Sequence, residues 1–388
     1  MNPANPFRLM LLRPREMPSL DLIAQQAGIS LPEDLQPRFN MLPVLAVILD
    51  ETGAPVWEAT LFLAYRALRS RSQTGDSVRS YAEALLVWLA FLNQRRIAPV
   101  DATEETLGIY SAKLVHVGHT RPLSATTSRH RITVASLFHQ WGVRSGSMTS
   151  PLGRWLVETG YENQIPDPRR YGRSIKRLGI APPPVQRLPR ILSREEISRL
   201  FLIAPMPYRL MFRWALATGM RRFEVCGLCL NQLPQAEIIA SSDDGLLPID
   251  VLRKGGRLCT VYAPVALIEE TNWYALMDRP QSGAREVFVN TRGAAISRHR
   301  LTSVFRRCAD RIGTKATLHN LRHTFAVHVL RILEGYERRG DAMNSLKTLQ
   351  VLLGHSSIET TEIYLRAVEV SGEPVEHALK FLYGNAIE

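Results

Sequence analysis

The sequence predicts a mainly α-helical protein with a small β-sheet, divided into separate domains. Apolar residues recur at helical spacing on both sides of a proline-rich stretch at residues 163–190. In the second half, Gly255 and Gly256 stand between two short strand-like runs, a pattern typical of a tight hairpin turn. A chain of 388 residues exceeds one ordinary domain. We therefore expect a helical domain at residues 55–162 and a mixed α+β domain at residues 191–388.

Residues 1–54 are the least informative part of the chain. The run from Pro43 to Asp50, followed by residues 51–55, predicts a strand and a turn that lead into the first helix. The segment could be an arm that binds accessory sites, or it could pack against the helical domain. We favour packing, because the segment is not basic.

Residues 55–162 contain four helical stripes of apolar residues, which begin at Trp57, Val78, Leu107 and Ile132. Asp101 or Thr103 is the expected N-terminal cap of the third helix. Arginines near these helices are candidate phosphate contacts, although ordinary surface charge explains each of them equally well. They are Arg69, Arg71, Arg79, Arg121, Arg129 and Arg131.

The stretch at residues 163–190 is basic, with Asp167 as its one acidic residue. Prolines stiffen and extend such a segment, so its cations can lie along a phosphate backbone. A solvated linker without a partner is the alternative. The formal net charge of +12 also points to a polyanion, but it would suit a membrane surface or RNA as well. The cations proposed to contact the backbone are Arg169, Arg170, Arg173, Lys176 and Arg177.

Five residues of the second half form the most informative pattern: Arg221 in TGMRRFEV, His319 and Arg322 in LHNLRHTF, His355 after LLG, and Tyr364 nine residues later. The spacing of His319 and Arg322 places both on one helix face. Gly354 is a plausible helix cap, so His355 is expected at a corner between helices. Such cations could stabilise the charge that develops when a phenolic oxygen attacks a phosphodiester, with no metal or other cofactor.

Two further residues extend this pattern. Glu224 follows Arg221 by three residues, so its carboxylate could hold the guanidinium in place. Lys254 would stand at the tip of the predicted hairpin. Arg222 is the alternative to Arg221, but the TG-x-R register and the offset to Glu224 favour Arg221.

These motifs resemble the catalytic domain of the tyrosine recombinases, the phage integrase family. The family shows, in this order, an Arg in a TGxRxxE context, a hairpin Lys before Gly, HxxR, LGH and a Tyr nine residues later. The resemblance implies that Tyr364 is the nucleophile of a 3′-phosphotyrosyl link. It also implies that Arg221, Arg322, His319 and His355 stabilise the phosphorane, and that Lys254 protonates the departing 5′-oxygen. His319 is the nearer base by motif, but the sequence leaves the choice of base open.

The same resemblance makes residues 55–162 the core-binding domain and residues 191–388 the catalytic domain of a clamp on double-stranded DNA. A last amphipathic patch at residues 375–383 would dock onto a neighbouring protomer and give a homotetramer on two DNA sites. Residues 334–341 are longer and more polar than the turn usual between the two histidine motifs. We expect an extended loop or a lengthened helix end there.

Other site classes are disfavoured by the residue pattern. Cys226 and Cys229 have a zinc-like spacing, but Cys259 and Cys308 supply no second pair, so buried thiols are expected instead of a metal site. The longest apolar run, residues 85–92, is too short to span a bilayer. No export signal is evident, and we expect a cytoplasmic protein.

Three functions remain compatible with the sequence: a site-specific recombinase of a mobile element, a topoisomerase with the same chemistry, and a DNA-binding relative that does not cleave. The complete motif set disfavours the third. The helical domain, the linker and the C-terminal patch favour recombination over relaxation. The DNA site, the direction of the reaction and any accessory proteins are not encoded in a recognisable pattern.

Overall fold

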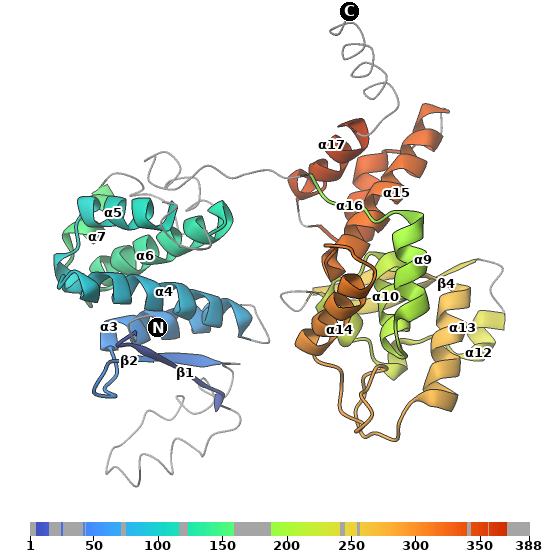
Figure 1. Cartoon of the computed structure of the whole chain (residues 1–388), viewed down its shortest axis with the longest axis horizontal. Coiled ribbons are helices and arrows are strands. Elements are labelled where there is room, and N and C mark those ends of the chain that lie inside the picture. The colour runs from blue at the N-terminus through green and yellow to red at the C-terminus, as the bar shows by residue number, and fades with distance from the viewer. Residues whose placement is uncertain are drawn as a thin grey trace, which may run out of the picture. The chain divides into compact units, whose positions relative to one another are not determined.

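The computed structural model describes most of the chain and divides it into two compact units, Met1–Gln186 and Arg187–Glu388 (Figure 1). The predicted fold class is confirmed, because helices dominate both units and the sheets are small. The described residues are 5–14, 25, 42, 44–70, 75–115, 123–158, 188–240, 245–253, 257–339, 343–355 and 357–370.

The first unit combines a two-stranded sheet with a set of helices. Strand β1 (Arg8–Leu12) pairs antiparallel with β2 (Leu45–Leu49), which lies inside the segment for which a strand was predicted. Thr103 caps the third predicted helix, because its hydroxyl accepts a hydrogen bond from the Thr106 backbone at 3.3 Å. The helices are α3 (Trp57–Leu68), α4 (Asp76–Gln94), α5 (Glu104–Val115), α6 (Ala125–Ser145) and α7 (Pro151–Glu158).

The core of this unit is built from the predicted apolar stripes. Phe62 of α3 and Phe138 of α6 meet edge to face, with ring centroids 5.7 Å apart. Ala46 and Ile48 of β2 are fully buried in the same cluster, so the N-terminal strand packs against the helices. Buried His139 accepts a hydrogen bond from the Trp88 indole at 3.0 Å, and burial lowers its pKa to about 3. It is therefore a neutral core histidine.

The second unit contains most of the helices and one β-hairpin. Strands β3 (Leu246–Arg253) and β4 (Arg257–Pro264) pair antiparallel and bracket the predicted turn, whose residues 254–256 lie outside the described residues. Its helices begin at a capping box, in which Ser193 and Glu196 bond reciprocally. They are α9 (Arg194–Ile203), α10 (Tyr208–Thr218), α11 (Arg222–Cys226), α12 (Ala236–Ala240), α13 (Val265–Trp273), α14 (Arg298–Arg311), α15 (Leu318–Arg338), α16 (Ser345–Leu353) and α17 (Glu362–Val370).

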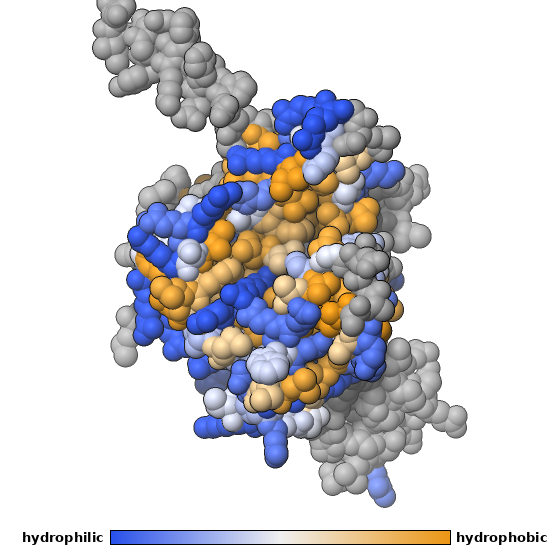
Figure 2. Space-filling model, turned by 90° about the vertical axis from the view of Figure 1, so that its right-hand side faces the viewer, coloured by the Kyte–Doolittle hydropathy of each residue, from blue (hydrophilic) through white to orange (hydrophobic). Residues whose placement is uncertain are grey.

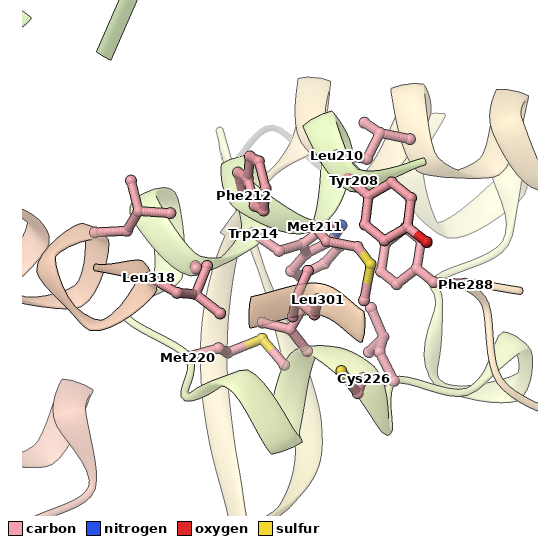
Figure 3. Close-up of a cluster of buried hydrophobic side chains, with 14 of the residues drawn as sticks. Tyr208, Leu210, Met211, Phe212, Trp214, Met220, Cys226, Phe288, Leu301 and Leu318 are labelled. Atoms are coloured by element: carbon pink, nitrogen blue, oxygen red, sulfur yellow. The ribbon is translucent and has the colours of Figure 1, made fainter. Parts of the chain in front are cut away.

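Helix α10 lies at the centre of this unit and supplies Leu210, Met211, Phe212 and Trp214 to its core (Figure 3). It packs against α15, and it ends where Gly219 adopts a left-handed φ of 66°. A side chain at Gly219 would also collide with Phe325 of α15. The chain can therefore turn sharply from α10 toward Arg221.

The buried Trp214 indole gives a direct test of this core. Its N–H donates to the Thr271 hydroxyl of α13 at 2.9 Å, and both residues are fully buried. We expect Thr271→Val to leave the indole N–H unpaired and to cost about 1–3 kcal/mol of unfolding free energy. Urea denaturation followed by tryptophan fluorescence measures this loss. The control is Thr260→Val on the exposed face of β4, expected within about 0.5 kcal/mol of wild type; equal losses in both variants would refute the assignment.

Apolar side chains also reach the surface of the second unit. Figure 2 views the protein from the side on which α13 lies, and orange apolar groups appear there among blue polar ones. Trp273 at the end of α13 is largely exposed, and so are Leu276 and Met277 in the helical turn that follows it. Among the described residues, no helix combines the length and the apolar character that crossing a membrane would need.

Candidate active site

Arg221 is held at the start of α11 by Glu224. Its backbone N–H donates to Oε2 of Glu224 at 2.7 Å, and its Nη1 donates to Oε1 at 3.2 Å. The Glu224 side chain is fully buried, so this carboxylate is fixed in place. The neighbouring Arg222 is exposed and donates instead to the Thr302 hydroxyl of α14 at 3.4 Å. Of the two arginines, Arg221 is the one in contact with Glu224.

Arg322 joins three of the predicted motifs. It lies in the second turn of α15 and is only 2% exposed. Its guanidinium donates to the Gly219 carbonyl oxygen, to the Leu353 carbonyl oxygen at 2.9 Å and to Nε2 of His355 at 2.9 Å. Burial, and next the charge of Arg221, lower its pKa to about 10, which still leaves it charged at neutral pH. Arg322 therefore ties the end of α10 to the end of α16.

His355 occupies the predicted corner after α16, where Gly354 is left-handed at φ 57°. Because Arg322 can only donate, Nε2 of His355 must accept, and the proton of the ring must be on Nδ1. Nδ1 accordingly donates to the Thr361 hydroxyl at 2.9 Å. Burial, and after it the charges of Arg322 and Arg221, lower the pKa of His355 to about 3. The imidazole is neutral, and both of its nitrogens are engaged.

Arg253 is a member of this cluster that the motif analysis did not identify. It ends β3 directly before Lys254, and its side chain is 4% exposed. It donates to the Leu353 carbonyl oxygen and, at 3.2 Å, to the Leu352 carbonyl oxygen; its Nε lies 3.8 Å from Oε1 of Glu224. The alternation along β3 puts Arg253 on the buried face and could have signalled it. The predicted Lys254 itself lies outside the described residues.

The contact between Arg253 and Gly354 leads to a further prediction. A Cβ at Gly354 would overlap the Arg253 guanidinium, and the residue also has a positive φ. We expect Gly354→Ala to displace Arg253 and to destabilise the protein by at least about 1–2 kcal/mol through the left-handed backbone alone. Thermal unfolding and cleavage assays test this expectation. Gly335→Ala is the control, because Gly335 lies inside α15 and a Cβ added there would meet no neighbouring side chain. A Gly354→Ala protein as stable and active as the control would contradict the packing described.

Tyr364 lies in α17 with its ring buried among residues of α15 and α16, and it is 3% exposed. Its hydroxyl is hydrogen-bonded to Nδ1 of His323 at 3.0 Å. Its ring lies nearly parallel to that of His355, at 10° and 6.3 Å between centroids. Burial raises the pKa of the phenol, although Arg322 and Arg221 oppose this rise. The hydroxyl is therefore protonated at neutral pH and needs a proton acceptor before it can attack.

Two histidines near the start of α15, His319 and His323, lie next to each other. His319 is exposed, and its ring centroid is 4.3 Å from that of His323. Desolvation by the surrounding protein, then Arg322 and Arg221, lower the pKa of His319. The sequence analysis did not identify His323, because no motif spacing links it to Tyr364. Its role becomes visible only when α17 packs on α15.

The charges of this cluster are unbalanced. Among the described residues, Arg221, Arg253 and Arg322 lie around one carboxylate, that of Glu224. The neighbouring histidines have lowered pKa values and add no charge at neutral pH. An excess of fixed guanidinium groups beside a phenol is suited to a phosphate anion and to the charge that develops on it during substitution.

The candidate DNA contacts are described only in part. Arg69 stacks over the Tyr65 ring at 4.4 Å, Arg79 forms an exposed ion pair with Glu83 at 2.8 Å, and Arg129 and Arg131 lie on α6. Their contact with DNA stays a prediction. Seven others lie outside the described residues: Arg71, Arg121, Arg169, Arg170, Arg173, Lys176 and Arg177. The patch at residues 375–383 lies outside them as well.

Two other segments differ from the sequence prediction or extend it. The polar stretch at residues 334–341 is a lengthened helix end as far as Arg338, after which residues 340–342 lie outside the described part. Helix α14, which the sequence analysis did not single out, carries the exposed Arg306 and Arg307.

The two cysteines near Arg221 were both expected to be buried. Cys226 is buried in α11, and burial raises the pKa of its thiol to about 12. Cys229 lies beyond the helix and is partly exposed, so the expectation was wrong for this residue.

Comparison with known proteins agrees with this geometry. Residues 190–369 match the model of the phage integrase family. The tyrosine recombinase XerC of Xanthomonas campestris pv. campestris is 28% identical over 331 residues, which cover 81% of this chain and 86% of that protein. The XerH site-specific recombinase bound to a palindromic difH substrate shares the fold, with a TM-score of 0.52, 19% identity and coverage of 80% of this chain and 82% of that one. A lambda integrase tetramer bound to a Holliday junction has a TM-score of 0.51 at 19% identity, covering 78% and 77%. Residues 190–369 are therefore a phage integrase family domain, and the chain is similar over most of its length to proteins named as tyrosine recombinases.

Proposed function

We propose that this protein is a site-specific recombinase in which Tyr364 attacks a DNA phosphodiester and forms a 3′-phosphotyrosyl intermediate. The observation that carries the proposal is the buried Tyr364 hydroxyl in the field of Arg221 and Arg322, whose guanidinium groups are held by Glu224 and by backbone carbonyl oxygens. A phosphate that binds there would supply the missing negative charge. It would also place its phosphorus within reach of the nucleophile.

The groups of the cluster would divide the work of the reaction. Arg221 and Arg322 would bind the non-bridging oxygens and stabilise the phosphorane, because their guanidinium groups are already oriented by Glu224 and by backbone carbonyl oxygens. His355 would stay neutral and keep Arg322 in position through Nε2. Lys254 would protonate the departing 5′-oxygen. The phosphotyrosyl bond conserves the energy of the phosphodiester, so rejoining needs no nucleotide cofactor.

The remainder of the chain would hold the DNA. In this proposal the helical unit is the core-binding half of a clamp, and the basic stretch at residues 163–190 lies along the phosphate backbone. The exposed Arg306 and Arg307 of α14 add to the positive surface of the catalytic half. By analogy with the lambda integrase tetramer, four protomers would act on two DNA sites. The biological role would be integration, excision or transposition of a mobile element.

A plasmid assay tests the proposal against relaxation by a single protomer. The DNA site is first selected from a randomised duplex pool by the purified protein, and two copies are placed in one supercoiled plasmid. We expect deletion or inversion of the segment between the copies, and no product from a plasmid without them. Relaxation of both plasmids without exchange would identify a topoisomerase activity. Binding without nicks or adducts would instead identify a DNA-binding protein that does not cleave.

A further inference from the structure

The identity of the group that accepts the Tyr364 proton can be addressed by the hydrogen bonds of the histidines. His355 is the first candidate, because its ring stacks on that of Tyr364. However, the lone pair of its Nε2 accepts from Arg322, and its Nδ1 carries the proton that is donated to Thr361. Neither nitrogen is available to receive a proton while Arg322 holds its place.

His319 is the second candidate, and it lacks the required contact. Among the described residues, Tyr364 has its hydroxyl bonded to His323, and His319 has no hydrogen bond to that hydroxyl. The ring of His319 lies against His323 instead, at 4.3 Å between centroids. His319 is exposed at this position, so we assign it to the phosphate, the role that the family resemblance implies.

His323 makes the contact that a proton acceptor requires. The Tyr364 hydroxyl lies 3.0 Å from Nδ1 of His323, and it can donate to that nitrogen when the imidazole carries its proton on Nε2. This distance is already within the range for direct proton transfer. Building on the function proposed above, we propose that His323 is a catalytic residue, the general base that takes the proton of Tyr364 during strand cleavage.

The step balances without any added reactant. The Tyr364 oxygen forms a bond to phosphorus while its proton passes to Nδ1 of His323, which becomes an imidazolium. The bond between phosphorus and the 5′-oxygen breaks, and that oxygen takes a proton from Lys254. In the rejoining step the 5′-hydroxyl gives its proton back to Lys254 and attacks phosphorus, the bond to Tyr364 breaks, and His323 returns its proton to the phenol oxygen.

The charges around His323 set its behaviour with pH. His319 and Arg322 face it from α15, and Tyr364 faces it from α17 with the His355 ring beyond. Burial, and then the fields of His319 and Arg322, lower the pKa of His323 to about 4. A base works only when it is unprotonated, so this base is ready at every pH above about 5. The negative charge that builds on the phosphorane raises its affinity for the proton as the reaction proceeds.

Single-turnover cleavage of a nicked duplex carrying the selected site tests the proposal. His323→Asn places an amide near the position of Nδ1, which can accept a hydrogen bond but cannot hold a proton. We expect cleavage to fall about 10²–10⁴-fold, the usual contribution of a general base. The wild-type rate should be level from pH 6 to pH 8, whereas the variant rate should rise about tenfold per pH unit, because phenolate must then form from a phenol whose pKa is above about 10.

Two controls separate this role from its alternatives. His328→Asn alters an exposed histidine of the same helix and should leave cleavage unchanged. A duplex with a 5′-bridging phosphorothioate needs no acid for its leaving group, so it should rescue Lys254→Ala but not His323→Asn. Unfolding temperature and DNA affinity check that His323→Asn folds and binds, and His323→Gln provides a second replacement.

A failure of the His323 proposal can be distinguished from a failure of the proposed function, because adduct formation by the wild-type protein tests the proposed function separately. His323→Asn and His323→Gln proteins that cleave at the wild-type rate with a level pH profile would overturn the assignment. Faster cleavage would overturn it too, because the hydrogen bond would then restrain Tyr364. A loss confined to His319→Asn would transfer the role of base to His319.

Discussion

Tyr364→Phe is expected to abolish covalent attachment to DNA while leaving DNA binding and folding nearly unchanged. The substitution removes one oxygen from a ring that is 3% exposed and packed among residues of α15 and α16, so the ring contacts survive. What is lost is the nucleophile, together with its hydrogen bond to His323. No other group replaces it in the proposed reaction, so the yield of adduct should fall below detection.

The measurement compares wild type and Tyr364→Phe on a nicked duplex carrying the selected site, with adducts separated in denaturant. Tyr336→Phe is the matched control, because Tyr336 is an exposed tyrosine of α15 whose ring contacts Arg339. It should form adducts as wild type does. Adducts that persist in Tyr364→Phe but vanish in Tyr336→Phe would move the nucleophile away from α17.

Arg322→Ala has the second largest expected effect. The guanidinium is buried and still charged at neutral pH, and it is the donor shared by the Gly219 carbonyl, the Leu353 carbonyl and His355. Its removal withdraws fixed positive charge from the developing phosphorane, so cleavage should fall by about a hundredfold or more. It also removes the Arg322 donor from the Gly219 carbonyl, at about 1–3 kcal/mol, so the unfolding temperature should drop as well; the Leu353 carbonyl keeps its hydrogen bond from Arg253.

Arg322→Lys separates charge from geometry. Lysine keeps the positive charge but cannot donate in the forked pattern that reaches three acceptors at once. We expect it to retain more stability than Arg322→Ala and to cleave slowly. Single-turnover rates measured well below both unfolding temperatures compare the two variants. If Arg322→Ala folded and cleaved at the wild-type rate, Arg322 would have no part in stabilising the phosphorane.

Much of the fold could be predicted from local patterns. The stripe beginning at Trp57 forms α3, and Ser193 with Glu196 caps α9, because these signals depend on neighbours within one helical turn. The paired glycines predicted the hairpin of β3 and β4 for the same reason. Strand β1 was missed, since its short apolar run gains a partner only from β2, more than thirty residues away.

The site was predictable as a set of residues but not as a network. The TGMRRFEV motif distinguished Arg221 from Arg222, because Glu224 lies three residues after Arg221. At that spacing the Glu224 carboxylate contacts Arg221 at the start of α11, whereas Arg222 contacts Thr302. Arg253 and His323 follow no such spacing. Their contacts are made across β3, α15, α16 and α17, so they depend on tertiary packing that a single sequence does not display. Contacts with DNA depend in addition on the shape of a partner molecule.

The most direct test of the central claim is the chemical identity of the protein–DNA bond. Wild-type protein is trapped on the nicked duplex, digested with trypsin and nuclease, and analysed by tandem mass spectrometry. The proposed function predicts a nucleotide joined through its 3′-phosphate to Tyr364 in the peptide that begins at Thr348, and a free 5′-hydroxyl on the released strand. A nucleotide on any other residue, or a link through a 5′-phosphate, would contradict it.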